Sequence, residues 1–149
     1  ALATEVVEFH DAALQEAGVS FGFAGTAAAA AAGAFAFWAA VCVLPAITPY
    51  FVMKVGHVPL VSYQRPGAPG VATEVSQLIT QSHAQHAPIR GVMLERLGPV
   101  VWHQNPADAS AVLEELEETA KLWLLSDRQA SALSEAHIQE LRESFGARW

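Results

Sequence analysis

Residues 44–67 have the sequence LPAITPYFVMKVGHVPLVSYQRPG, and they carry the strongest backbone signals in the chain. Pro45 and Pro49 have no N–H donor, and each favours extended geometry in the residue before it. We therefore expect no helix to cross 44–49.

Two short apolar runs follow these prolines, at 51–55 and 58–63. Gly56 and His57 separate the runs, and a glycine in the first central position is typical of a type II′ turn. The pattern predicts a tight β-hairpin. Pro59 cannot donate to a ladder, so its strand is expected at an edge or with its N–H side free.

The rest of the chain predicts a mixed domain of helices and strands. Hydrophobic periodicity and capping residues define four helices and two further strands: helices at 5–17, 71–86, 105–125 and 134–145, and strands at 89–94 and 97–103. Asn105 and Ser134 are the expected N-caps of the last two helices, and Gly146 is the expected end of the last one. The order predicts a single α/β (α+β) domain over 1–149, with a central antiparallel sheet covered by helices.

Composition excludes some classes of function. The chain has 149 residues and a net charge of −7, so it lacks the basic surface that a nucleic-acid partner needs. Its single cysteine, Cys42, rules out an internal disulfide and fits a reducing compartment such as the cytoplasm. The N-terminal residues are acidic and have no basic leader, so no secretory signal is expected there.

Three stretches resemble the class II aldolase/adducin family in the correct order. They are the 44–67 segment, the strand sequence LGPVV at 97–101, and the helix sequence EELEETAKL at 114–122. A weaker likeness covers 5–25. The closest branch is that of the four-carbon sugar-acid phosphate decarboxylases, the 3-oxo-tetronate 4-phosphate type. The resemblance implies a class II aldolase-like fold.

The resemblance also implies a metal-dependent lyase, but this chain departs from the family at the metal site. Family members bind a divalent metal, commonly zinc, through a His-x-His pair and a third histidine. The matching positions are 34–36, which read Ala-Phe-Ala, and Leu97. These side chains have no N, O or S donor, so we identify no metal ligand. The chain is therefore either a degenerate relative or a partial sequence that lacks some of the family's middle segment.

Two further site elements follow from the resemblance. The glycine-rich turn at 18–26 matches a family turn that cradles a substrate phosphate, which makes Gly22, Gly25 and Thr26 candidate phosphate-binding residues. A plain turn into a strand is the alternative. Tyr50 matches a family tyrosine that in some members donates a proton to the metal-stabilised carbanion, and it is the candidate catalytic residue. An aromatic side chain packed beside a hairpin is the alternative for Tyr50.

The segment 27–43 is the least ordinary part of the sequence. It opens with six alanines at 27–32, and no charged residue occurs from 17 to 53. A buried helix, a membrane span and a non-natural tract all fit this composition. A membrane span is disfavoured because no Lys or Arg flanks the run and two prolines interrupt its end.

Three further histidines lie outside the family motif, and none of them is expected to bind a metal. His83 and His86 have i, i+3 spacing on an expected helix but no third ligand, so solvated side chains are the preferred interpretation. His103 lies six residues beyond the family's ligand position, and strand register excludes it as a substitute.

The sequence thus predicts a class II aldolase-type lyase that cleaves or decarboxylates a small sugar or sugar-acid phosphate. By analogy with the family, it would assemble as a homotetramer. The alternatives are a non-catalytic aldolase/adducin-like domain for oligomerisation or binding, and a membrane-anchored module built on 17–43.

Overall fold

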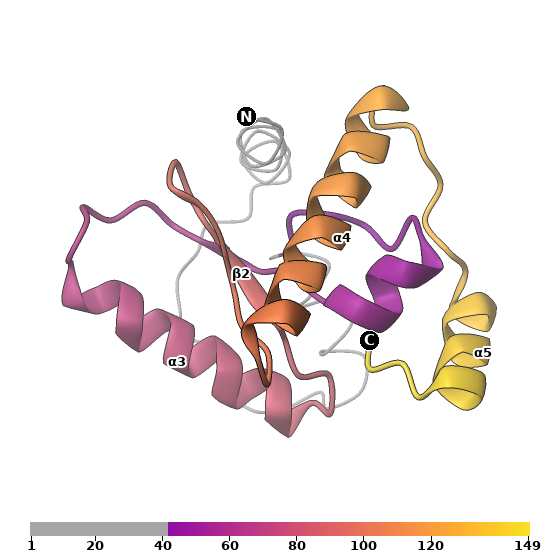
Figure 1. Cartoon of the computed structure of the whole chain (residues 1–149), viewed down its shortest axis with the longest axis horizontal. Coiled ribbons are helices and arrows are strands. Elements are labelled where there is room, and N and C mark those ends of the chain that lie inside the picture. Colours follow the sequence, from indigo (N-terminus) through magenta and orange to yellow (C-terminus); the bar gives the residue numbers. More distant parts are fainter. Residues whose placement is uncertain (1–41) are drawn as a thin grey trace, which may run out of the picture.

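The computed structural model of the chain describes residues 42–149 (Figure 1). The expected helix at 5–17 and residues 27–41 of the apolar segment lie outside the described residues. In chain order the described elements are η1 (Phe51–Val55), β1 (Leu60–Val61), α3 (Pro69–Ala84), β2 (Gly91–Leu94), β3 (Gly98–Val101), α4 (Pro106–Leu125) and α5 (Glu135–Phe145).

The three described strands form one mixed sheet in the order β1-β2-β3. β2 and β3 are antiparallel, with Val92 opposite Val100. β1 runs parallel to β2, with Leu60 opposite Met93. Parallel neighbours need a long crossover connection, and α3 provides it between β1 and β2. The α/β class is confirmed. Among the described strands β2 and β3 are antiparallel, and Cys42 forms an isolated antiparallel bridge with Pro59, but β1 and β2 are parallel.

The expected hairpin at 51–63 is wrong. Residues 51–55 form η1, a wide helical turn in which the Gly56 N–H donates to the carbonyl of Phe51 at 2.9 Å. The side-chain hydroxyl of Thr48 accepts from the Phe51 N–H at 3.0 Å and so caps the start of the turn. Gly56 ends the turn with a φ of 80°, a backbone conformation that glycine adopts more readily than residues with a Cβ atom. Only the second apolar run becomes a strand.

The sheet is packed between α3 and α4, which lie on opposite sides of the β2–β3 hairpin (Figure 1). Successive side chains of a strand point to opposite faces, and the two core clusters follow this alternation. The cluster with α4 contains Leu60 and Met93, whereas the cluster with α3 contains Val61 and Val92. Both faces of the sheet are therefore covered by apolar helix surfaces.

Among residues 42–149, β3 is the outer strand on the side of the sheet away from β1, and Pro99 limits the pairing of this side. The Trp102 N–H donates to the Arg90 carbonyl at 2.9 Å, so Trp102 belongs to a hydrogen-bonded pair. Hydrogen-bonded and non-hydrogen-bonded pairs alternate along an antiparallel ladder, so the pair of Pro99 and Met93, three positions from Trp102, is not hydrogen-bonded. The backbone nitrogen of Pro99 therefore points away from β2. Because proline has no N–H, it weakens this edge as a template for another strand.

Helices α4 and α5 confirm the expected caps. The Asn105 side chain accepts from the Asp108 N–H at 2.9 Å, and the Ser134 hydroxyl accepts from the His137 N–H at 3.3 Å. Gly146 ends α5 in the left-handed conformation, with a φ of 66°. Each of these three positions was identified from sequence alone.

The cap at Asn105 leads to a first prediction. Replacing Asn105 by alanine removes the acceptor for the Asp108 N–H, and we expect the free energy of unfolding to fall by about 1 kcal/mol. Urea unfolding followed by circular dichroism measures the change. Replacement by serine, which can also cap, should retain most of the stability. Equal losses in the two variants would show that the cap is not responsible.

The C-terminal residues pack onto the core. Trp149 is partly buried against the clusters on both sides of η1. Its ring centroid lies 4.0 Å from that of His57 and 5.7 Å from that of Phe51. Arg142 secures this position because its Nη2 donates to the Trp149 carbonyl at 2.8 Å.

Candidate active site

Tyr50 lies directly before η1 and projects outward from the fold. Its backbone is helical, yet 58% of the residue is exposed. The ammonium nitrogen of Lys54 lies 5.1 Å from the centroid of the Tyr50 ring. A phenol and an ammonium group therefore share the exposed side of one helical turn. This arrangement can offer both a proton and a positive charge to a bound anion.

The turn that carries this pair is firmly held. Phe51, Val52 and Val55 are fully buried, the first and last in the cluster with α4 and Val52 in the cluster with α5. The backbone of η1 is also held by Arg90, whose Nη1 donates to the carbonyls of Met53 and Lys54 at 3.2 and 2.9 Å. The backbone beneath Tyr50 is thus fixed by packing and by hydrogen bonds, as a reactive side chain requires.

Of the other expected site positions, only Leu97 lies within the described residues. Gly22, Gly25 and Thr26 lie outside the described residues, as do positions 34–36. Leu97 lies at the tip of the β2–β3 hairpin and is 54% exposed. It follows Arg96, whose φ of 62° makes the tight turn that was expected between the two strands.

The described residues do not fit a metal site of the family's kind. Within 42–149, no three His, Cys, Asp or Glu side chains come together. His83 is in α3, but the helix ends at Ala84 and His86 has a φ of 57°, so the two do not share a helical face. Nδ1 of His103 lies 3.2 Å from a carboxylate oxygen of Asp108, at the start of α4.

A cluster that the sequence did not indicate surrounds His57. The residue is 7% exposed, its Nδ1 lies 3.5 Å from the sulfur of Cys42, and its ring stacks on Trp149. Burial, with a smaller effect from Arg142, lowers the pKa of His57 to about 3. Burial raises the pKa of the Cys42 thiol well above its usual range. Both groups are therefore neutral at pH 7, and they do not form a nucleophilic thiolate–imidazolium pair.

No sequence signal marked this cluster. His57 stands between two apolar runs where the sequence predicts a turn, and no residue near Trp149 in the sequence indicates a buried contact. Their contact joins parts of the chain that are far apart in sequence, and periodicity reports only local structure.

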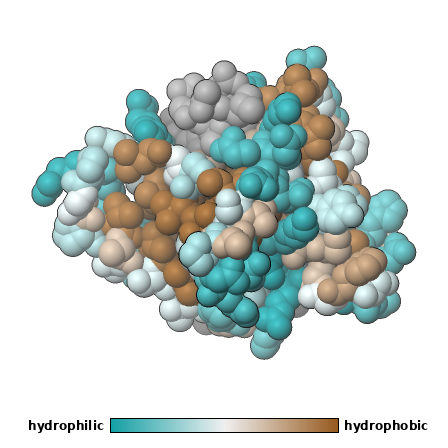
Figure 2. Space-filling model, viewed as in Figure 1, coloured by the Kyte–Doolittle hydropathy of each residue, from teal (hydrophilic) through white to brown (hydrophobic). Residues whose placement is uncertain are grey.

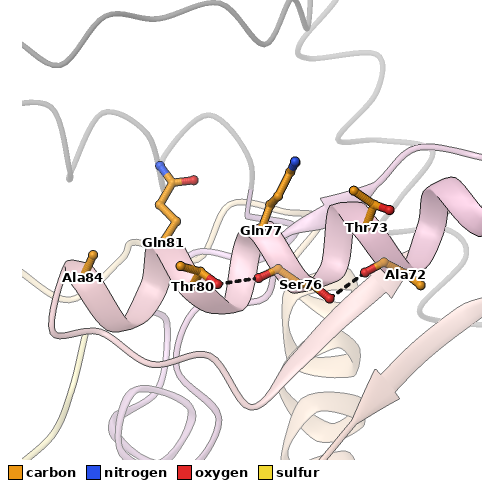
Figure 3. A pocket seen from close by; sticks show the side chains of 7 residues that line it. All are labelled: Ala72, Thr73, Ser76, Gln77, Thr80, Gln81 and Ala84. Atoms are coloured by element: carbon orange, nitrogen blue, oxygen red, sulfur yellow. Dashed lines mark hydrogen bonds between the residues drawn. The ribbon is translucent and has the colours of Figure 1, made fainter.

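A shallow hollow of about 630 Å³ runs along α3 (Figure 3). Its lining is uncharged, and the hydroxyls of Ser76 and Thr80 donate to the carbonyls of Ala72 and Ser76 in the same helix, at 2.8 and 2.9 Å. The lining residues are Ala72, Thr73, Ser76, Gln77, Thr80, Gln81 and Ala84. They include no ionisable side chain that could activate a serine or threonine hydroxyl, so Tyr50 remains the candidate catalytic residue.

The chain is similar to a known domain and to named enzymes. Residues 25–124 match the model of the Class II Aldolase and Adducin N-terminal domain. A 3-oxo-tetronate 4-phosphate decarboxylase of Cupriavidus necator is 52% identical over 112 residues, which cover 72% of this chain and 48% of that protein. A protein of the same name from Escherichia coli is 41% identical over 101 residues, covering 67% and 44%. The chain thus spans about half the length of these relatives.

Solved structures agree with the sequence comparison. The crystal structure of YgbL from Escherichia coli aligns with a TM-score of 0.58 at 40% identity, covering 68% of this chain and 46% of that one. YgbL from Klebsiella pneumoniae gives a TM-score of 0.59 at 35% identity, with the same coverage. The sequence expectation of family and fold is confirmed, and the chain belongs to the class II aldolase/adducin family.

Proposed function

We propose that the chain acts as a carbon–carbon lyase on a small sugar or sugar-acid phosphate, by aldol cleavage or, preferably, by decarboxylation. The observation that carries the proposal is the 52% identity to a 3-oxo-tetronate 4-phosphate decarboxylase, in a match that covers 72% of the chain. A 3-oxo acid loses CO₂ readily, because the electron pair of the broken C–C bond passes into the neighbouring carbonyl.

In this proposal Tyr50 is the acid. When the C–C bond breaks, the carbon that lost CO₂ becomes electron-rich and takes the phenolic proton of Tyr50, which is left as a phenolate. Solvent then restores the proton. The 58% exposure of Tyr50 on a rigid turn supports this role, because a substrate can reach the hydroxyl without rearrangement of the core.

The substrate phosphate is assigned to Gly22, Gly25 and Thr26. Glycine-rich turns let backbone N–H groups approach an anion, which is the physical basis of this assignment. Zinc is the cofactor implied by the resemblance. Because residues 42–149 do not fit such a site, we derive no step of the reaction through a metal.

The single domain over 1–149, the homotetramer and the cytoplasmic compartment belong to the same proposal. Apolar surface supports self-association: Leu122 and Leu125, near the end of α4, are 48% and 73% exposed, and Figure 2 shows apolar atoms there and between α3 and the β2–β3 hairpin. The lone Cys42 supports a reducing compartment. Within 42–149, no helix has the length and apolar character to cross a bilayer.

A non-catalytic role is the second candidate, and Leu97 favours it. This leucine occupies the position that the resemblance gives to a histidine, and it is exposed at a hairpin tip. A domain that keeps the scaffold without the ligands would serve assembly or binding. The two candidates differ in one measurable property, which is turnover.

The test is turnover of 3-oxo-tetronate 4-phosphate by the purified chain and by Tyr50→Phe. We expect kcat for CO₂ release to fall about 100-fold or more in the variant, because general acids contribute factors of that size. Tyr63→Phe is the matched control, since Tyr63 is 52% exposed and lies away from η1 in sequence. Absence of turnover in the unaltered chain supplied with zinc would favour the non-catalytic candidate.

A further inference from the structure

Lys54 has one described partner, and it is the ring of Tyr50. The ammonium nitrogen lies 5.1 Å from the ring centroid, within the range of a cation–π contact. No carboxylate among residues 42–149 forms an ion pair with Lys54. The sequence explains this, because no Asp or Glu occurs from 17 to 73. The positive charge is therefore not neutralised by a neighbour along the chain.

The geometry of the turn holds the two side chains together. Tyr50 and Lys54 are four residues apart, and both are exposed, while Phe51 and Val55 point into the core. The carbonyl of Lys54 accepts from Arg90 at 2.9 Å, so the backbone of the lysine is anchored as well. Only the side chain of Lys54 is left to move, and its contact with the ring restrains the phenol.

We propose that Lys54 is a positioning residue for Tyr50, which holds the phenol in place and favours the negative charge that develops on it as the proton leaves. This inference rests on the proposed function. The charge effect is Coulombic and acts across a few ångströms at the protein surface, so it is modest. Because the Coulombic effect of Lys54 acts on charge that develops in the transition state, we expect it to change kcat rather than KM.

The first experiment compares five variants in the decarboxylation assay, including Tyr50→Phe as the reference for the double variant. We expect Lys54→Met to lower kcat about two- to five-fold with little change in KM, and Lys54→Arg to retain activity. In a Tyr50→Phe background, Lys54→Met should have no further effect. Lys121→Met is the matched control, because Lys121 pairs with Glu118 on α4 and should leave turnover unchanged.

Two outcomes of this experiment would overturn the inference. If Lys54→Met raises KM and leaves kcat intact, the lysine binds an anionic group of the substrate instead. If it lowers kcat equally with and without the Tyr50 hydroxyl, it acts independently of the tyrosine.

The second experiment needs no turnover and separates this inference from the proposed function. Tetranitromethane attacks the phenolate form of tyrosine, and the chain has two tyrosines of similar exposure, Tyr50 at 58% and Tyr63 at 52%. We expect Lys54→Met to slow nitration of Tyr50 about two- to five-fold relative to Tyr63, as measured by peptide mass spectrometry. An unchanged ratio would refute the inference. A changed ratio in a chain without turnover would uphold the coupling and reject the lyase.

Discussion

Replacing Phe51 by alanine lowers the free energy of unfolding by about 3–5 kcal/mol. Phe51 is fully buried in the cluster with α4, and its ring meets that of Trp149 edge to face, with centroids 5.7 Å apart. The truncation leaves a cavity at the centre of the described core and removes the aromatic contact. Equilibrium unfolding in urea, followed by far-ultraviolet circular dichroism, measures the loss.

The neighbouring residue provides the control. Tyr50→Ala changes an aromatic of similar size that is 58% exposed, and we expect a change of at most about 1 kcal/mol. Comparable losses at the two positions would mean that the turn is not anchored through Phe51, and the assignment of buried and exposed sides would be wrong.

Acidification from pH 7 to 4.5 should remove about 2.5 kcal/mol of stability through His57 alone. Burial lowers the pKa of His57 from 6.5 to about 3 in the folded protein. In the unfolded chain the imidazole of His57 is therefore protonated as the pH falls below about 6.5. In the folded protein it stays neutral down to about pH 3. The stabilising contribution is present above pH 6.5 and is lost as the pH falls through that window.

The measurement is the free energy of unfolding at several pH values in wild type and in His57→Gln. The variant is expected to be less stable at pH 7 but to have a flatter profile between pH 6.5 and 4.5. His83→Gln, at an exposed position of α3, should keep the steep profile. If the free energy of unfolding depends on pH equally in wild type and in His57→Gln, the pKa of His57 is not lowered by folding.

Local signals in the sequence were sufficient for the helices after residue 68. Asn105 and Ser134 supply side-chain acceptors, and Gly146 supplies the left-handed exit, so each boundary depends on residues next to it. Tertiary contacts only reinforce these choices. The helix start was placed two residues late at α3, where Pro69 is in the first turn.

The error at 51–55 has a clear physical origin. Valine and phenylalanine favour strands, but Thr48 caps the turn, Pro49 stands where a helix begins, and Gly56 ends it. These capping signals were present in the sequence and outweigh side-chain preference over five residues. Because residues 51–55 are helical, they cannot pair with the run at 58–63. That run instead pairs in parallel with β2, which follows it in the chain after the crossover helix α3.

The candidate site was predictable only where it depends on local sequence. Tyr50 was identified from its motif, and the structure places it on the exposed side of η1. The contact with Lys54 follows from the helical turn, which the hairpin prediction excluded. The cluster of His57 and Trp149 depends on packing across most of the described chain, and residue types alone give no indication of it.

The position of Trp149 also has a consequence for the order in which the protein is made. Phe51 and His57 are synthesised before the ring that covers them, which follows more than ninety positions later in the chain. Until then, this part of the core stays open to water and to other nascent chains. The domain therefore completes this part of its core only after Trp149 has been synthesised.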